Sequence, residues 1–313
     1  MPPCGGCTTG APDAEAPTIL TLTENLRTIV YAPLYLADTR GYWAGAGLDV
    51  RVALSDAPAD TADTLLDGRA QVAWGGPMRV MMYHEKDPDC PLVCFGQIVA
   101  RDPFVLVGRE PNRAFRFADL RGRRLAVARE VPTPWMTLQD DLARAGVARE
   151  DLRLAADAPM AEAPARLAAG EIDVAQVLEP YATQAIDAGA HLWHRFATRG
   201  DIGYTAFYTT RGFLAAAPET CRALLAGLQP ALTAINREAP TALADELKGH
   251  FPGLEVDTLA RVIVGYRESG LWPSSGTALP PSAFVRLKAA LLSGGLVSRD
   301  MPCDHLVANL EPP

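Results

Sequence analysis

The chain contains one short pattern twice, and this echo limits how it can fold. The first copy runs from Leu66 to Pro77 and the second from Ala169 to Pro180. Each copy predicts a helix that ends at a glycine, a short apolar strand, a turn, and a new helix with proline near its first position. The spacing from glycine to proline differs by one residue, so the copies are similar units and not a strict repeat. The echo predicts two α/β lobes with a ligand cleft between them.

Length, composition and charge set broad limits on fold and partners. With 313 residues the chain is long enough for two lobes and a large core. Its 49% apolar and 21% charged residues are typical of a globular protein. The net charge of −8 disfavours a nucleic-acid partner, because phosphate binding needs a basic face. The densest basic run, Arg121, Arg123 and Arg124, is interpreted as a solvated turn and not as an anion site.

The N-terminal segment and the apolar runs bear on location. No apolar run approaches the roughly 20 residues of a membrane-spanning helix, so we expect no membrane insertion. Residues 1–17 are rich in Pro, Gly and Ala and are expected to form a disordered leader. They have neither the basic start nor the apolar stretch of a signal peptide. From these residues alone we expect a cytoplasmic protein, unless the start is truncated or misassigned.

The spacing of the six cysteines does not assign a metal site. Cys4 and Cys7 have the C-x-x-C spacing of a metal or redox pair, but no second pair or nearby histidine completes a zinc site. This pair also falls within the expected leader. Cys94 lies in a predicted apolar strand and is interpreted as core. We therefore expect no metal and no cofactor.

Alternating strand and helix patterns give the order of the elements. Expected strands are 18–22, 48–52, 72–74, 92–99, 104–107, 124–128, 152–154 and 204–209, with a strand-turn-helix over 172–186. Expected helices are 32–40, 61–66, 77–85, 134–145, 162–169, 218–237, 241–247, 256–266 and 281–292, with a short last piece near Asp304.

This order predicts an α/β protein with two parallel-sheet lobes and a helical C-terminal part. Lobe 1 is expected to comprise 18–99 plus 206–313, and lobe 2 to comprise 100–205. The chain would cross between the lobes near 99–104 and again near 197–205. Two crossings form a two-strand hinge, which suits closure around a ligand.

Four loops that follow predicted strands are expected to face the cleft: 23–25, 75–77, 132–134 and 179–181. Helix N-termini carry free N–H groups and a positive dipole end, so they suit anionic or hydrogen-bonding ligands. Thr133 either caps its own helix or offers its hydroxyl to a ligand. Gly75 and Gly76 either let a ligand approach the backbone or simply form a tight turn.

Glu179 also has two interpretations. It either caps its own helix or accepts hydrogen bonds from a ligand amine or amidine. A carboxylate there would repel a simple anion, which favours a ligand with N–H donors. Aromatic residues near the loops predict a stacking pocket for a flat ring. No catalytic or metal-ligating residue is assigned, and the candidate ligand-binding residues are Asn25, Tyr31, Trp74, Gly75, Gly76, Thr133, Trp135, Glu179, Tyr181 and Tyr204.

Three segments carry a resemblance to a known family. Residues 31–50, with Gly41-Tyr42-Trp43 and Gly47-Leu48-Asp49-Val50, resemble its opening, and residues 119–127 and 170–181 resemble two further segments. The family comprises substrate-binding proteins for sulfonates, taurine and thiamine-pyrimidine precursors, and it also contains the yeast-type thiamine pyrimidine synthase. The similarity extends over most of the chain, from about Thr18 to Leu310.

The resemblance implies a type II periplasmic-binding fold and solute capture for an ABC importer. A permease and ATPase would then be the partners, and the protein would be a periplasmic monomer. Pyrimidine-binding members use the glutamate of the Glu-Pro pair and cleft aromatics on a flat heterocycle. This resemblance implies a ligand role for Glu179, and it extends that role to Asn25 and Trp74. From the ligands of this family, the expected solute is small and aromatic or heterocyclic, pyrimidine-like or sulfonate-like.

Importer members normally carry an export signal, which this chain lacks.

Two alternatives on the same fold remain open, a thiamine-pyrimidine-synthase-like enzyme and a cytoplasmic ligand sensor. The synthase branch carries a cysteine cluster, a His and a Lys, of which only His84 and Lys86 offer a partial match, interpreted here as a solvated helix end. A desulfinase branch needs a cysteine in the loop after the first strand, and residues 23–31 contain none. A non-enzymatic binding protein is therefore the leading hypothesis.

Overall fold

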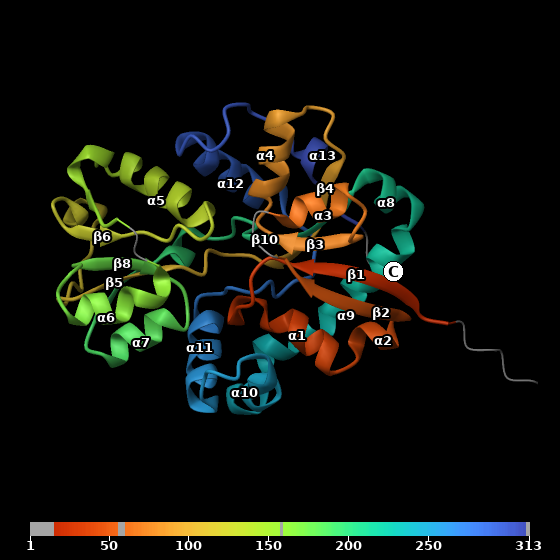
Figure 1. Ribbon diagram of the computed structural model, residues 1–313, viewed down its shortest axis with the longest axis horizontal. Helices are drawn as coiled ribbons and strands as arrows, with labels where there is room; N and C mark the ends of the chain where they lie inside the picture. Colours follow the sequence, from red (N-terminus) through yellow and green to blue (C-terminus); the bar gives the residue numbers. More distant parts are fainter. Residues whose placement is uncertain (1–15, 56–59, 157–158, 311–313) are drawn as a thin grey trace, which may run out of the picture.

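The computed structural model describes residues 16–55, 60–156 and 159–310. Two halves lie side by side along its long axis, and each is built on a five-stranded sheet (Figure 1). The expected leader, 1–17, with Cys4 and Cys7, falls outside the described residues except for its last two positions. The first strand begins directly after it, at Thr18.

The first sheet has the strand order β2-β1-β3-β10-β4. Strand β1 pairs in parallel with β2 and β3, whereas β10 runs antiparallel to both β3 and β4. Its strands are β1 (Thr18–Glu24), β2 (Leu48–Leu54), β3 (Val72–Gly75), β4 (Leu92–Val99) and β10 (Thr205–Thr210). The helices of this half are α1 (Ala32–Thr39), α2 (Tyr42–Gly45), α3 (Thr61–Leu66), α4 (Met78–Lys86), α8 (Arg211–Ala216) and α9 (Pro218–Arg237).

The second sheet has the order β7-β6-β8-β5-β9. Strand β6 pairs in parallel with β7 and β8, and β5 runs antiparallel to β8 and β9. Its strands are β5 (Val105–Gly108), β6 (Arg124–Ala126), β7 (Arg153–Leu154), β8 (Val174–Val177) and β9 (His191–Arg195). Its helices are α5 (Thr133–Arg144), α6 (Ala163–Ala168) and α7 (Tyr181–Asp187).

The predicted two-lobed α/β architecture is confirmed, but both sheets are mixed and not purely parallel. In each sheet one strand opposes the other four, and it is the first strand after the chain has crossed from the other half: β5 after β4, and β10 after β9. Both crossing segments line the cavity at the carboxyl ends of β1, β3 and β8. A strand that enters from that edge must run away from it, opposite to its neighbours.

The echo is built as predicted, as β3 leading into α4 and β8 leading into α7. Gly68 follows α3 with a φ of 72°, and Gly170 follows α6 with a φ of 70°. These left-handed conformations end the helices, and a side chain would strain them. The two glycines thus turn the chain into the strands of the two sheets.

The C-terminal part is helical, as predicted, and it contacts both halves. Helix α10 packs against α11, whereas α12 packs against α5 of the second half. These helices are α10 (Pro240–Leu247), α11 (Val256–Glu268), α12 (Pro281–Ser293) and α13 (Cys303–Leu306). Short 3₁₀ turns are η1 (Ile29–Tyr31), η3 (Phe117–Leu120), η4 (Arg149–Asp151), η5 (Met160–Glu162), η6 (Phe196–Arg199) and η7 (Lys248–His250).

Three elements were missing from the predicted order: α2, β9 and α8. Strand β9 reads His-Leu-Trp-His-Arg, so polar residues outnumber apolar ones and no β pattern stands out. Helix α8 is short and none of its residues is buried. Across the described residues, every helix is too short or too polar to traverse a lipid bilayer.

Candidate ligand site between the two sheets

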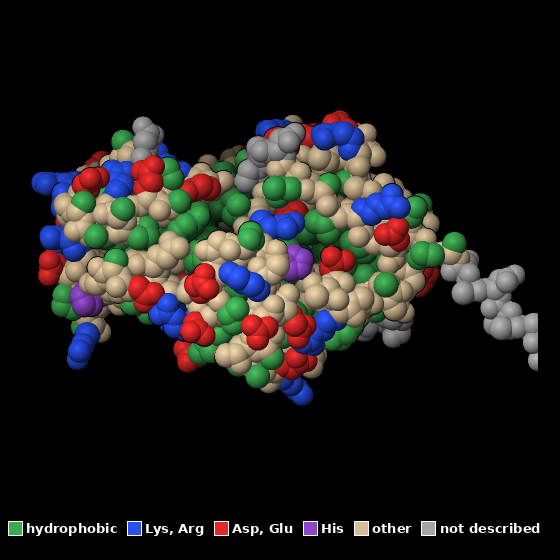
Figure 2. Space-filling view, turned by 60° about the horizontal axis from the view of Figure 1, so that its bottom comes forward, with side chains coloured by type: hydrophobic (Ala, Val, Ile, Leu, Met, Phe, Trp, Pro, Cys, Tyr) green, Lys and Arg blue, Asp and Glu red, His purple; other side chains and the backbone are tan. Residues whose placement is uncertain are grey.

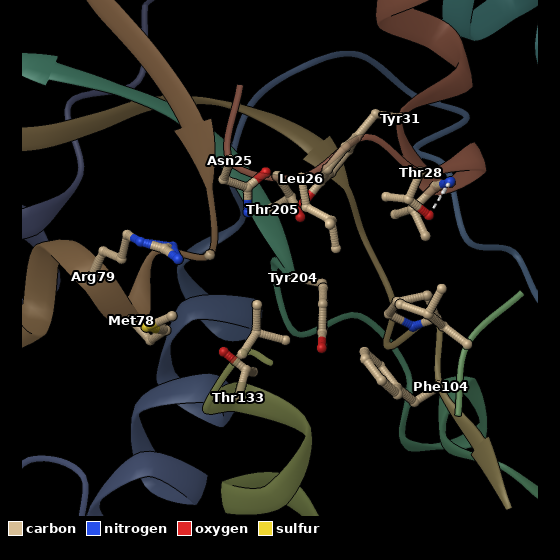
Figure 3. A pocket seen from close by; sticks show the side chains of 15 residues that line it. Asn25, Leu26, Thr28, Tyr31, Met78, Arg79, Phe104, Thr133, Tyr204 and Thr205 are labelled. Atoms are coloured by element: carbon tan, nitrogen blue, oxygen red, sulfur yellow. Dashed lines mark hydrogen bonds between the residues drawn. The ribbon is translucent and has the colours of Figure 1, made fainter. Parts of the chain in front are cut away.

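A cavity lies where the two halves meet, and we call it the cleft cavity (Figure 3). It is lined by the loops after β1, β3 and β8, by the first turns of α4 and α5, and by both crossing segments. Its volume is about 30 Å³, which is small beside the roughly 300–1,000 Å³ of typical ligand pockets. The cavity thus sits at the strand ends of both lobes, where open α/β sheets bind small molecules.

A buried arginine dominates the charge of the cleft cavity. Arg79 is the second residue of α4 and is only 4% exposed. Its Nε and Nη1 atoms have no hydrogen-bond partner among the described residues, and no carboxylate of that part of the chain forms an ion pair with it. The helix dipole adds further positive potential at this end of α4. The cavity is therefore a strongly electropositive place.

Three more polar side chains lining the cavity have buried atoms without a partner in the described part of the chain. These atoms are Asn25 Oδ1, Tyr204 OH and Thr205 Oγ1. Burial, together with the charge of Asp102, keeps the pKa of Tyr204 well above its usual range, so its hydroxyl is a neutral donor. In Figure 3, Arg79, Tyr204 and Thr133 approach the cavity from α4, the second crossing segment and α5.

Tyr31 closes the cavity from η1. Burial raises the pKa of its phenol, and the charge of Arg79 partly opposes that rise. Its ring also meets Trp74 edge-on, with centroids 5.9 Å apart. Tyr31 is therefore a neutral side chain that lies between the polar lining of the cleft cavity and the core at Trp74.

The structure brings five of the ten predicted site residues together around the cleft cavity, and the other five do not line it. The five that line it are Asn25, Tyr31, Gly76, Thr133 and Tyr204. A Cβ atom on Gly76 would lie 3.5 Å from Thr133 Oγ1 and 3.6 Å from the Tyr204 carbonyl oxygen. Gly76 therefore keeps the gap between the lobes narrow, whereas a Cβ on Gly75 would lie 3.4 Å from Nη1 of Arg79.

Both tryptophans lie elsewhere. Trp74 has no exposed surface and packs behind Tyr31, because it stands on the central strand β3. Trp135 sits on α5 under the guanidinium of Arg149, whose Cζ is 5.7 Å from the ring centroid. Neither ring reaches the cavity, so the expected aromatic stacking pocket is not built from them.

Glu179 caps its own helix, which is the plainer of its two interpretations. Its Oε2 accepts a hydrogen bond from the Thr183 backbone N–H at 2.9 Å, in the first turn of α7. Its own N–H donates to the Tyr266 hydroxyl at 3.2 Å. Burial raises the pKa of Glu179. Glu179 and Tyr181 line a neighbouring cavity instead of the cleft cavity.

Arg79 is the main residue that the sequence analysis missed. It falls within the helix expected over 77–85, and its neighbours in sequence gave no sign of its burial. One signal was available: an arginine in the first turn of a helix stands at the positive end of the dipole, where a cation is unfavourable without an anion nearby.

The residues of the enzyme alternatives lie away from the cleft cavity. His84 and Lys86 stand in the last turn of α4, whereas the cavity meets its first turn. His84 is buried against the Leu92 carbonyl oxygen, 2.9 Å from its Nε2, which corrects the solvated helix end expected for it. Within the described residues no cysteine lines the cavity, and no three His, Cys, Asp or Glu side chains are grouped to hold a metal.

Known proteins resemble this chain over nearly its whole length. The candidate binding protein YtlA of Bacillus subtilis (strain 168) is 23% identical over 296 residues, which cover 94% of this chain and 88% of YtlA. The alkanesulfonate-binding protein SsuA of Xanthomonas axonopodis pv. citri, bound to MOPS, superposes with a TM-score of 0.73 at 17% identity, over 95% of this chain and all (100%) of that one.

A third similar structure is the nitrate-binding protein NrtA of Synechocystis PCC 6803, with a TM-score of 0.66 at 15% identity, over 93% of this chain and 86% of that one. These structures show that the fold is that of periplasmic binding proteins, as the resemblance implied. The family described as NMT1/THI5 like matches residues 28–239, about two thirds of the chain. The chain belongs to the NMT1/THI5-like family.

Proposed function

We propose that this protein is the solute-binding component of an ABC importer and that it captures a small organic anion with a sulfonate-type head group. The observation that carries the proposal is Arg79, a buried guanidinium without a counter-ion in the described part of the chain. Burying an unpaired charge costs several kcal/mol, on the order of the value of a strong ligand contact. A bound anion would offset that cost with charge-assisted hydrogen bonds.

The donor set favours an anion over a neutral pyrimidine. Arg79, Tyr204 and Thr205 offer N–H and O–H groups to the cavity, and a sulfonate carries three acceptor oxygens and one negative charge. The pyrimidine interpretation rested on Glu179, which lies outside the cleft cavity. Two of the similar structures belong to proteins named for anions, an alkanesulfonate and nitrate.

Lobe closure would couple binding to transport. We propose that residues 18–99 with 206–313 and residues 100–205 move as two lobes about the crossing segments. Contacts between the parts support a closed form: Arg261 on α11 pairs with Asp187 on α7 at 2.7 Å. The closed, loaded protein would then dock on the permease and ATPase from the extracytoplasmic side.

Calorimetric titration with butanesulfonate tests the proposal. The native chain should bind it, and Arg79→Gln should weaken binding by about tenfold to a hundredfold, the value of hydrogen bonds to a charged group. Arg69→Gln is the matched control, because Arg69 is an exposed arginine paired with Asp67. Equal binding of a neutral aminopyrimidine by the native chain and by Arg79→Gln, with no binding of butanesulfonate, would show that the anion proposal is wrong.

A further inference from the structure

A second cavity adjoins the cleft cavity, and we call it the side cavity. Both cavities are lined by Leu26 and Thr28 from the loop after β1 and by Leu178 from the loop after β8. The side cavity extends from this shared wall to η5 and to the segment 250–254. Figure 2 shows hydrophobic side chains gathered in the recess between the two halves.

The two cavities differ in size. The cleft cavity has a volume of about 30 Å³, far below the roughly 300–1,000 Å³ of typical ligand pockets, so at most a compact head group can lie there. The side cavity has a volume of about 460 Å³, within the range of small-molecule pockets. An organic anion whose head lies at Arg79 therefore has room for the rest of its body only beyond the shared wall.

The side cavity also differs in chemistry. Its wall includes Ile29, Met160, Phe251 and Leu254, which suit an alkyl or aryl group. Its cationic side chain, Arg27, is already paired with Glu24, at 2.7 Å.

The lining of the side cavity also includes two carboxylates and a neutral imidazole. Glu130 and Glu179 line the side cavity and already accept backbone hydrogen bonds, from Met160 N at 2.8 Å and from Thr183 N at 2.9 Å. Burial lowers the pKa of His250, so its ring is neutral near pH 7. A second anionic group would meet negative charge here, so the side cavity selects against dianions.

From this arrangement we infer that the side cavity is a second subsite, which receives the apolar tail of an organic monoanion whose head is held at Arg79. The inference rests on the proposed function and narrows its ligand to amphipathic monoanions. Leu26, Thr28 and Leu178 form the passage between the subsites. The head group supplies the charge-specific contacts, and the tail adds affinity in proportion to the apolar surface that it buries.

A chain-length series tests the inference. Affinities of methane-, butane- and octanesulfonate should rise by about twofold to fourfold per methylene, the value of burying a CH₂ group in part or in full. Hexane-1,6-disulfonate should bind more weakly than hexanesulfonate, because its second sulfonate would face Glu130 and Glu179. All titrations use the full chain.

Ala161→Trp is the variant that fills the side cavity. Ala161 lines it but is exposed, so folding should be unaffected, and this variant should flatten the chain-length dependence while it leaves methanesulfonate binding unchanged. Ala165→Trp is the matched control, since Ala165 is exposed on α6 and does not line the cavity.

The outcomes separate the two proposals. Equal affinities from methane- to octanesulfonate, all lost in Arg79→Gln, would overturn the tail subsite and leave the proposed function standing. Binding of no sulfonate at all, or binding that Arg79→Gln does not weaken, would overturn the proposed function and the subsite with it. A length dependence that Ala161→Trp does not alter would also refute the subsite.

Discussion

Two arginines with little exposure stand in opposite surroundings. Arg199, in η6, pairs with Asp102 at 3.2 Å and with Asp141, and it donates to the Thr137 carbonyl oxygen. Arg79, at the cleft, pairs with no carboxylate of the described residues. The fold thus places carboxylates beside the partly buried Arg199, and none of the described residues supplies a carboxylate to the buried Arg79.

This difference indicates two roles: Arg199 stabilises the fold, whereas Arg79 is available to bind an anionic ligand. Arg199 ties the first crossing segment, through Asp102, to α5 of the second half. Because Arg199 has carboxylate partners within the chain, replacing it should destabilise the fold. Because Arg79 has no such partner among the described residues, replacing it should weaken ligand binding without destabilising the fold.

The largest effect is expected from Arg199→Met. This change leaves Asp102 and Asp141 near each other without their shared cation, and breaking a buried pair costs about 3–5 kcal/mol. Urea denaturation should show this loss in the free energy of unfolding. A loss below about 1 kcal/mol would mean that Arg199 is not the structural partner described here.

The pH dependence of the same network comes next. Burial raises the pKa of Asp102 to about 6 and outweighs the attraction of Arg199. Because this pKa exceeds that of the unfolded chain, the contribution of Asp102 to stability is present below about pH 4 and is lost as the pH rises through 6. The stability of Asp102→Asn relative to the native chain should therefore rise by up to about 3 kcal/mol between pH 4 and 6.5. A difference independent of pH would contradict this account.

Arg79→Met tests whether Arg79 serves ligand binding and not, like Arg199, the stability of the fold. Butanesulfonate affinity should fall by about tenfold to a hundredfold. The ligand-free variant should unfold at the same or a higher temperature than the native chain, because a buried unpaired charge is removed and the methionine still fills the space. Thermal denaturation with and without butanesulfonate measures both effects. A ligand-free variant that unfolds at a lower temperature would assign Arg79 a structural role like that of Arg199.

Tyr204→Phe should have a smaller effect. It deletes one neutral donor from the cleft cavity and keeps the ring, so affinity for butanesulfonate should fall by about twofold to tenfold. Stability should change little, because the hydroxyl has no partner in the described chain. Calorimetric titration with butanesulfonate measures this change in affinity. An unchanged affinity would show that the Tyr204 hydroxyl does not contact the ligand.

The smallest effect is expected from Glu179→Gln. Glutamine can keep the cap on α7, and the side chain lies in the side cavity, away from the head group. Butanesulfonate affinity should stay within about twofold of the native value, as for most changes outside a direct contact. A large loss would restore Glu179 to the primary site that the sequence analysis gave it.

The sequence by itself determined the order of the elements and the loops that meet at the cleft. Gly68 and Gly170 end helices, and short apolar runs form strands, because both depend on local backbone and side-chain preferences. The capping role of Glu179 could also be predicted from the sequence, because a helix cap forms between residues that are neighbours in the chain.

Only the tertiary structure decided the direction of β5 and β10 and the state of Arg79. Strand direction depends on the edge at which the chain re-enters a sheet, and sequence periodicity does not record it. A buried cation becomes a binding group only where carboxylates from distant segments are absent. Asp102 and Asp141 meet Arg199 through folding, and no such partner from the described residues meets Arg79. Because Coulomb forces act through space and not along the chain, this distinction exists only in the folded protein.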